Sequence, residues 1–578
     1  MKVTTKFNPK IYEIMSGYNT ERLIKDLGAG TTVAIVALPL AMAFAIASGL
    51  KPETGIFTAI IAGFLISLFS GSRVQIGGPA GAFIVIVYGI VERYGVGGLL
   101  LATFMSGFML WAMGFFRMGI LIKFIPVAVI IGFTNGIAVL IGISQVKDFL
   151  GLHIEGKTPA EFFALLHTLW NALPTWNPQA LFLALLSLAI IILWQKSTQP
   201  GGGQSGGQSV GQNTQGVSAM LHRIRSTTPG SIIALLVATI LAQLFHLDVE
   251  TIGSRFGGIP QGLPSFTIPL PHAADGGWSL SVIWEAMKGL VAPAATLAVL
   301  GAIESLLCAR VADNMIKDKH DSNQELLAQG FANMVVPFFG GMPATGTIAR
   351  TVTNIKNGAT SPVSGIIHAL VLLVVVLVAA PLAQYIPLAA LSAILMFVAY
   401  NMGEWHEFAR LRSYRMTYRF ILLAVFILTV VVDLTAAVEV GILAACFTLI
   451  YRVSYLSTED QVDLSEWGEQ ADGVKARRLV GTLFFGAVKL IDQLQLDIPK
   501  RALVLDFSGV IYVDSSGAES LNELLEMYQE KAVPIYIYGL REQPLEMLTR
   551  TGWLKDLGQA YVCANLDEAR QKIAAQGA

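Results

Sequence analysis

The sequence predicts an α-helical membrane protein of fourteen spans, followed by a small cytosolic α/β domain. Of its 578 residues, 54% are hydrophobic and only 14% are charged, against about 25% charged residues in a typical soluble protein. Two similar segments rich in glycine and proline, residues 77–83 and 340–347, interrupt apolar runs in the two halves of the chain. From about Glu469 the apolar runs give way to short strands that alternate with helices.

The N-terminal segment, residues 1–28, is polar and mixed in charge. It contains no short apolar core followed by a cleavage site, so it is not a signal peptide and the first span is retained. The net charge is −1 and no basic patch stands out, which argues against a nucleic-acid partner.

The transmembrane region is expected between residues 29 and 456. Its fourteen candidate spans are Thr31–Ser48, Gly55–Phe69, Pro79–Val91, Val96–Phe115, Ile122–Ile143, Ala180–Trp194, Ser231–Phe245, Gly289–Cys308, Gln324–Phe339, Gly346–Ile355, Pro362–Ala380, Pro387–Tyr400, Tyr418–Val432 and Ala436–Tyr451. The third and tenth are too short to cross about 30 Å of hydrocarbon alone. Seven spans per half, each with a broken third member, predict an inverted 7+7 repeat.

Basic residues test this count, because cytoplasmic loops carry an excess of Lys and Arg. With the N-terminus inside, the cytoplasmic connections contain Arg73, Arg117, Lys123, Lys196, Arg223, Arg225, Arg310, Lys317, Lys319, Lys356, Arg410, Arg412 and Arg415. The opposite side carries Lys51, Arg93, Lys147, Lys157, Arg255 and Lys288. The asymmetry predicts that both termini are cytosolic. Residues 197–217, a Gly/Gln/Ser tract, are expected to form a flexible linker on the same side.

The two interruptions indicate a substrate site. Irregular backbone at membrane depth persists only where it is buried or lines a cavity, and a restarted helix presents unpaired N–H groups and a positive dipole end. Two such ends that face one point would bind an anion. Gly81 and Gly346 occupy matching places at the two helix starts, where the backbone would approach the substrate or, alternatively, a neighbouring helix.

Residues 470–578 alternate strand and helix patterns, which is typical of a compact α/β domain. Together with the membrane region, the motif Val513-Asp514-Ser515-Ser516-Gly517 resembles the SulP (sulfate permease) family of anion transporters with a C-terminal STAS domain. Further motifs of this resemblance are residues 37–45 (ALPLAMAFA), 71–73 (GSR) before Gly77-Gly78-Pro79, 302–307 (AIESLL) and 349–354 (ARTVTN). Within the family, the chain is most similar to bacterial members that carry C4-dicarboxylates, followed by sulfate and bicarbonate transporters.

The resemblance implies a core domain of spans 1–4 and 8–11, a gate domain of spans 5–7 and 12–14, an elevator motion and a homodimer in the inner membrane. It implies proton-coupled symport of a dicarboxylate (succinate, fumarate or aspartate) or of sulfate, without enzymatic activity, cofactor or metal. Sodium-coupled bicarbonate transport, exchange or a channel is the alternative. The implied substrate-binding residues are Phe44, Ala80, Gly81, Ala82, Thr345, Gly346, Thr347 and Arg350.

Glu304 is the candidate for ion coupling. A carboxylate in mid-span costs roughly 2.5–3.5 kcal/mol by insertion scales and usually has a function. Burial disfavours the charged form of a carboxylate, and this makes the uptake and release of a proton by Glu304 practical. The alternative is a structural ion pair with Arg310 or Arg350.

Several other side chains have two readings. Arg350 either adds charge to the anion site or reaches the cytoplasmic surface as an anchor, and Phe44 either lines the pocket or packs in the core. Thr345 and Thr347 could donate to an anion, cap a helix, or do both. His368 is expected to be a hydrogen-bonded core residue.

The positions that hold sodium in the bicarbonate branch correspond to Ala80, Cys308 and Ile348, which offer no hard oxygen ligand and so favour protons. Ser516 matches a serine that is phosphorylated in small STAS proteins, or else caps the helix that follows.

Three functional classes fit the sequence: a transporter, a passive channel and a membrane sensor that signals through the STAS domain. Concentrative uptake driven by a pH gradient separates the first from the others.

Overall fold

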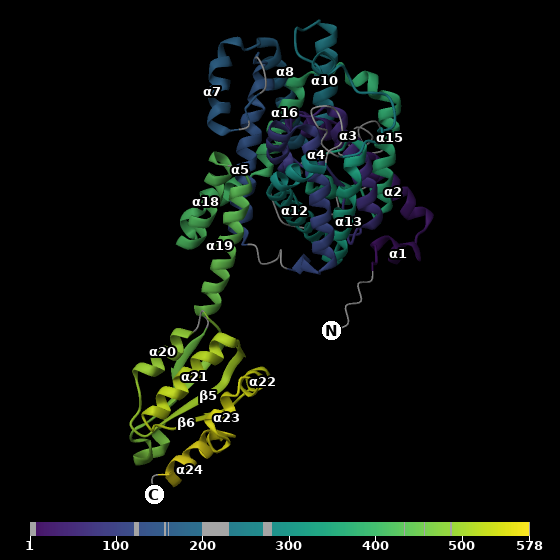
Figure 1. The fold of residues 1–578 in the computed structure, drawn as a ribbon. Coiled ribbons are helices and arrows are strands. Elements are labelled where there is room, and N and C mark those ends of the chain that lie inside the picture. The colour runs from purple at the N-terminus through teal and green to yellow at the C-terminus, as the bar shows by residue number, and fades with distance from the viewer. Residues whose placement is uncertain are drawn as a thin grey trace. The chain divides into compact units, whose positions relative to one another are not determined.

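A computed structural model describes residues 7–120, 126–154, 158–159, 161–198, 230–269, 280–432, 434–455, 457–485 and 488–576. The chain forms two compact units, Met1–Ile442 and Leu443–Ala578, and each is described by itself (Figure 1). The first is helical and the second is built on a sheet.

The first unit contains helices of very different lengths. They are α1 (Lys10–Met15), α2 (Thr20–Ala47), α3 (Pro52–Phe69), α4 (Ile84–Phe115), α5 (Val127–Ser144), α6 (Val146–Leu150), α7 (Phe162–Ala172), α8 (Pro178–Thr198), α10 (Gly230–Leu244), α11 (Ile252–Phe256), α12 (Leu280–Ile316), α13 (Ser322–Val335), α14 (Ile348–Lys356), α15 (Val363–Ala383), α16 (Leu388–Met402), α17 (Trp405–Ala409) and α18 (Met416–Val431). A further helix, α19 (Leu434–Tyr455), begins in the first unit and ends in the second.

Among the described residues, seven helices are long and apolar enough to cross a membrane, and three shorter apolar helices accompany them. The chain is thus a multi-pass membrane protein, while the number of fourteen spans stays a prediction. Predicted spans 3 and 4 both lie within α4, which consists of two helical segments that meet at Gly95, where the backbone is not helical (φ 70°, ψ −176°). A glycine suits this junction because other residues rarely adopt positive φ. α14 has nine residues and, at about 1.5 Å per residue, is too short to span a bilayer.

The helices of this unit pack in two sets. One set contains α2, α3, α4, α12, α13, α14 and α15, and the other contains α5, α6, α8, α10, α16 and α18. Glycines bring backbones together within each set. At the crossing of α4 and α13, for example, a Cβ on Gly107 would lie 2.6 Å from the backbone nitrogen of Met334, and one on Gly330 would lie 2.4 Å from that of Trp111. Small residues permit such close helix packing in membranes.

Some predicted boundaries differ from the structure. α2 begins at Thr20, before the first predicted span at Thr31 and inside the polar N-terminal segment, because Asn19 accepts a hydrogen bond from the Arg22 backbone and caps the helix. The first two residues of the predicted linker 197–217, Ser197 and Thr198, form the end of α8, and the rest of the linker lies outside the described residues. Of the three cysteines, Cys308 and Cys563 are buried and Cys446 is exposed.

The second unit is the predicted α/β domain. Its five-stranded sheet has the order β3-β4-β5-β6-β7, with β3 antiparallel to β4 and the other neighbours parallel. The sheet begins at Thr458, before the predicted start at residue 470, since β3 completes its edge. The elements are β3 (Thr458–Gln461), β4 (Val474–Leu483), α20 (Val488–Leu496), β5 (Ala502–Val513), α21 (Ser515–Glu530), β6 (Ile535–Tyr538), α22 (Glu542–Arg550), α23 (Trp553–Leu557), β7 (Val562–Cys563) and α24 (Leu566–Gln576).

The central strand β5 supplies both faces of this sheet. Leu503, Leu505 and Phe507 belong to one buried cluster, which includes residues of α20 to α23. Ala502 and Val504 belong to a second cluster, which includes residues of α24. This alternation follows from the two-residue period of a strand. The domain therefore has hydrophobic cores of its own.

Candidate functional site

The two interrupted segments meet in the structure. Strand β1 (Gly77–Gly78) pairs antiparallel with β2 (Thr345–Gly346), with Gly77 opposite Gly346 and Gly78 opposite Thr345. The backbone N–H of Thr347 extends the pairing by donating to the carbonyl of Ile76 at 2.9 Å. After each strand a helix restarts: α14 directly, and α4 through a 3₁₀ turn at Gly81–Phe83. The two half-helix starts, at Gly81 and Ile348, are far apart in sequence and share one buried crossing, as the sequence predicts.

One face of α12 supports this crossing. The carbonyl of Gly301 accepts a hydrogen bond from the Thr345 hydroxyl at 2.9 Å, and that of Ser305 accepts one from Gln75 Nε2 at 3.1 Å. One turn on, Cys308 Sγ lies 3.2 Å from Thr351 Oγ1. Residues three and four apart lie on the same helix face, so Glu304 falls between these contacts.

Glu304 is half-buried on this face. Among the described residues, its carboxylate has no salt bridge within 4 Å, so the ion pair with Arg310 or Arg350 that was the alternative reading does not form. A carboxylate at membrane depth without a cationic partner is costly in its charged form. Among the described residues, the geometry therefore does not support a structural ion pair for Glu304.

Arg350 lies on the other side of the crossing, one turn into α14. It is 1% exposed, so the reading as a surface anchor is wrong. A Cβ on Gly78 would lie 2.3 Å from Arg350 Nη1, which places the guanidinium against β1. Neither Nη1 nor Nη2 has a hydrogen-bond partner among the described residues. A buried unpaired cation is strongly unfavourable, and an anion would compensate it.

His368 of α15 is fully buried, as predicted, but the expected hydrogen bond is absent. Neither ring nitrogen has a partner within the described part of the chain. The ring packs beside Gly63 of α3, where an added Cβ would lie 3.4 Å from Nδ1 and Cε1.

The two threonines are not free donors. Thr345 Oγ1 donates to Gly301, and Thr347 Oγ1 donates to the carbonyl of Ile76 at 3.1 Å. Thr347 is the N-cap residue of α14, yet its side chain makes no capping hydrogen bond. Both hydroxyls therefore hold the crossing together, and the expectation that they cap a helix is wrong.

Gly81 and Gly346 are not equivalent, contrary to the expectation of matching places. A Cβ on Gly346 would lie 1.7 Å from Gln75 Nε2, whereas one on Gly81 would make ordinary contacts, 3.5 Å from Phe44 Cε1 and 3.7 Å from Met402 Sδ. Gly346 is thus needed for packing. Gly81 is buried close to Phe44 of α2 and Met402 of α16, at the contact between the two helix sets.

Ala80 and Ala82 are buried beside Gly81, at the start of the same half-helix. Sequence reasoning missed Met402 and Gln75. Nothing in the sequence relates Met402 to residue 81, but Gln75 is a polar residue within an apolar turn just before Gly77, which could have drawn attention to it.

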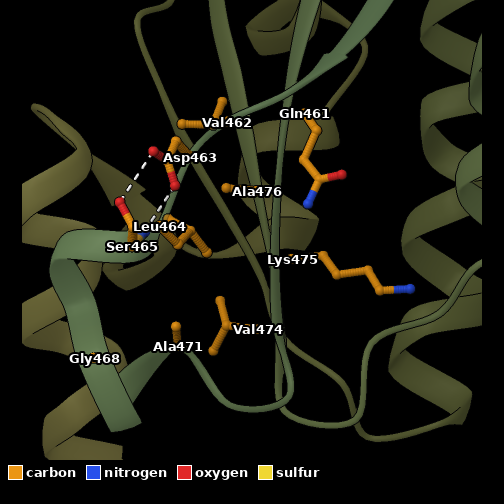
Figure 2. Close-up of a pocket in the computed structure, with 10 residues that line it drawn as sticks. All are labelled: Gln461, Val462, Asp463, Leu464, Ser465, Gly468, Ala471, Val474, Lys475 and Ala476. Carbon is orange, nitrogen blue, oxygen red and sulfur yellow. Dashed lines mark hydrogen bonds between the residues drawn. The ribbon is translucent and has the colours of Figure 1, made fainter.

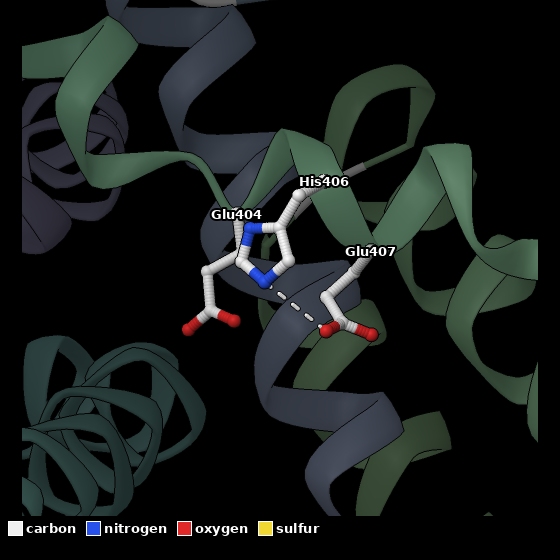
Figure 3. A group of neighbouring side chains, drawn as sticks. All are labelled: Glu404, His406 and Glu407. Atoms are coloured by element: carbon white, nitrogen blue, oxygen red, sulfur yellow. Dashed lines mark ion pairs between the residues drawn. The ribbon is translucent and has the colours of Figure 1, made fainter. Parts of the chain in front are cut away.

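Two further features lie away from the crossing. Figure 3 shows Glu404, His406 and Glu407 near α17, a group of potential metal ligands whose atoms lie within 4.8 Å of one another. His406 Nε2 lies 3.1 Å from Glu407 Oε1, and Tyr414 donates to Glu407 Oε2 at 2.6 Å. Because Glu407 is already engaged by both neighbours and the group is largely exposed, we assign no metal to it.

In the second unit, a pocket of about 300 Å³ lies beside β4, and Figure 2 shows the residues that line it. Asp463 at its rim accepts hydrogen bonds from the backbone and hydroxyl of Ser465, which lower the pKa of the Asp463 carboxyl. Elsewhere in this unit, Asp514 rather than Ser516 caps α21, by accepting from the Gly517 N–H at 2.8 Å. Ser516 is exposed in the first turn, so its hydroxyl is accessible.

Comparisons with known proteins agree with this architecture. The model of the sulfate permease family matches residues 23–425, and that of the STAS domain matches residues 469–569. A Bacillus subtilis (strain 168) protein named "Putative sulfate transporter YvdB" is 41% identical over 558 residues, which cover 96% of this chain and 98% of the relative. The Synechocystis protein named "Bicarbonate transporter BicA" is 31% identical over 93% of this chain and 92% of its own length.

Solved structures show the same fold. The transmembrane domain of a cyanobacterial bicarbonate transporter, BicA, matches with a TM-score of 0.59 and 30% identity over 73% of this chain and 98% of its own. Murine Slc26a9, an anion transporter in the inward-facing state, matches with a TM-score of 0.80 and 18% identity over 100% of this chain and 96% of its own. The chain therefore belongs to the sulfate permease family and carries a C-terminal STAS domain.

Proposed function

We propose that this protein is a secondary active transporter that moves a small dianion together with protons. The substrate is sulfate or a C4-dicarboxylate such as succinate, fumarate or aspartate. The relatives named as sulfate transporters support an inorganic anion, while the dicarboxylate rests on the sequence motifs alone.

The observation that carries this proposal is the placement of two unpaired ionisable residues around the β1–β2 crossing. Arg350 contributes one positive charge, and the two half-helix starts contribute roughly +0.5 each. Together they amount to about +2, which matches a dianion. An ionised Glu304 would offset part of this charge, so protonation of Glu304 and anion binding favour each other.

The two helix sets support an elevator mechanism. In this proposal, the set that holds the crossing, with α2 and α15, is the core, and the set with α5, α10 and α16 is the gate. Gly81 and Phe44 of the core face Met402 of the gate, so a sliding core would carry the anion past Met402. The homodimer, the inner membrane and the cytosolic termini belong to the same proposal.

Sodium-coupled bicarbonate transport is the second candidate, because two relatives at 30–31% identity are named bicarbonate transporters. Ala80 and Ile348 offer no oxygen ligand for sodium, and Cys308 is buried against Thr351. These residues favour protons over sodium.

Uptake into proteoliposomes tests the proposal. Labelled sulfate should accumulate when the lumen is alkaline and the outside acidic, with no sodium present. Unlabelled succinate, fumarate, aspartate and bicarbonate then compete in the same assay. Accumulation that requires sodium would favour the second candidate, and uptake that only equilibrates would favour a channel or an exchanger.

A further inference from the structure

An apolar cavity of about 750 Å³ lies between α2, α10 and α15, away from the β1–β2 crossing. Its walls are almost wholly aliphatic and include Leu38 of α2, Leu235 of α10 and Val376 of α15. Ligand pockets in proteins typically measure about 300–1,000 Å³, so the space is large enough for a flexible hydrocarbon chain.

The loop after α10 fixes one end of this cavity. The backbone N–H of Ile252 donates to the carbonyl of Ile386 at 3.0 Å, and that of Gly253 donates to Gln384 at 2.8 Å. In return, the N–H of Leu388 donates to Glu250 at 2.9 Å. These bonds tie the segment that follows α10, including the start of α11, to the junction of α15 and α16, so this end of the cavity is a feature of the packed fold.

The mouth of the cavity is continuous with the lipid-facing surface. Ile35 of α2, Ile240 of α10 and Leu382 of α15 line it, and they are 44%, 61% and 68% exposed. Along α10 the lining runs from Ile232 to Leu244, which is about 18 Å at 1.5 Å per residue. The hydrocarbon core of a bilayer is about 30 Å thick, so the cavity spans about one leaflet.

The polar lining residues lie at one end. Gln243 stands near the end of α10, and Tyr385 follows the end of α15. Tyrosine is enriched at the level of lipid headgroups, where its hydroxyl meets the polar region. Thr239, deeper in the cavity, donates its hydroxyl to the carbonyl of Leu235 at 2.8 Å and so presents no free donor. The cavity therefore has an apolar interior and a polar end, like a lipid.

We propose that this cavity binds one acyl chain of a membrane phospholipid, with the glycerol and headgroup beside Gln243 and Tyr385. Because α2 and α15 belong to one helix set and α10 to the other, the chain would lie at the contact between the sets. The proposal concerns lipid binding and does not depend on which anion is carried or on its coupling.

Photolabelling of the full-length protein in phosphatidylcholine vesicles tests the proposal. A phosphatidylcholine with a diazirine in its acyl chain is activated by light, and labelled residues are mapped by mass spectrometry. Label should concentrate on the cavity-lining residues of α10 and α15. Ala379→Phe fills the cavity from α15 and should lower that labelling about tenfold, which corresponds to roughly 1.4 kcal/mol of binding.

Val378→Phe is the matched control, since Val378 is adjacent on α15, 74% exposed and outside the lining. It should leave the labelling of the cavity unchanged. Ala383→Phe, near the polar end, replaces Ala379→Phe if the latter does not yield a monodisperse protein. Label spread evenly over the lipid-facing residues, equal labelling in the filled and control variants, or cross-links to a second copy of the chain at these residues would each overturn the proposal.

Discussion

Substitution of two glycines by alanine separates the anion site from its support. Gly346→Ala places a Cβ 1.7 Å from Gln75 Nε2, so the Gln75 amide must move. Gln75 then loses its hydrogen bond to the Ser305 carbonyl, and a buried polar group left without a partner costs about 1–3 kcal/mol. We therefore expect Gly346→Ala to lower the midpoint of thermal unfolding.

Gly81→Ala should behave in the opposite way. Its Cβ would make ordinary contacts with Phe44 and Met402, so the stability should change by no more than about 0.5 kcal/mol. In the proposed site the added methyl group lies where the anion approaches the start of the half-helix, and a tenfold loss of affinity corresponds to about 1.4 kcal/mol of binding. Sulfate affinity should thus fall about tenfold or more.

Thermal unfolding and sulfate binding are measured on the same purified variants by intrinsic fluorescence and calorimetry. The double variant Gln75→Ala/Gly346→Ala removes the clash, so its loss of stability should be smaller than the sum of the two single losses. The reasoning fails if Gly346→Ala is as stable as the wild type, or if Gly81→Ala loses stability and keeps its affinity.

Four further predictions follow from the contacts described. Arg350→Gln should abolish detectable sulfate binding in calorimetry while the protein remains folded, because the buried cation beside β1 is lost; retained affinity would contradict this. Deletion after Leu456 should lower transport or membrane abundance without changing which anions compete, and a changed preference would place part of the site outside the membrane unit. Asp514→Ala should cost the STAS domain about 1 kcal/mol, the typical value of an N-cap, and Ser516→Ala should be neutral by comparison in urea unfolding. In the same domain, burial would raise the pKa of Asp506, but hydrogen bonds from Ser508 and Arg478 lower that pKa below its usual value. The stability that ionised Asp506 contributes should therefore be full above about pH 4 and decline as the pH falls toward the lowered pKa. Asp506→Asn should remove this part of the acid dependence of unfolding.

Much of the fold follows from local patterns in the sequence. Apolar runs and alternating strands predict the membrane helices and the α/β domain because each depends on nearby residues. The paired interruptions predict the β1–β2 crossing because irregular backbone must be buried at membrane depth. Hydropathy gives the apolar span from Thr31 but not the start of α2 at Thr20, because the cap at Asn19 lies in a polar segment that hydropathy does not distinguish from a loop.

The side-chain roles were less predictable because they depend on contacts between distant segments. Gly346 and Gly81 look alike in sequence, and only the position of Gln75 shows that one is needed for packing. Thr345 and Thr347 resemble free donors until the carbonyls of Gly301 and Ile76 are placed beside them. The partner of Gly81 on α16, Met402, lies more than 300 residues away and carries no motif.

Proton movement driven by an anion gradient tests proton coupling through Glu304 most directly. Proteoliposomes are loaded with a fluorescent pH indicator, and sulfate is added outside at equal internal and external pH, with the membrane potential clamped. Wild-type protein should acidify the lumen as sulfate enters, and Glu304→Gln should leave the internal pH unchanged while it still binds sulfate. Acidification by the Glu304→Gln variant at the wild-type rate would contradict the account.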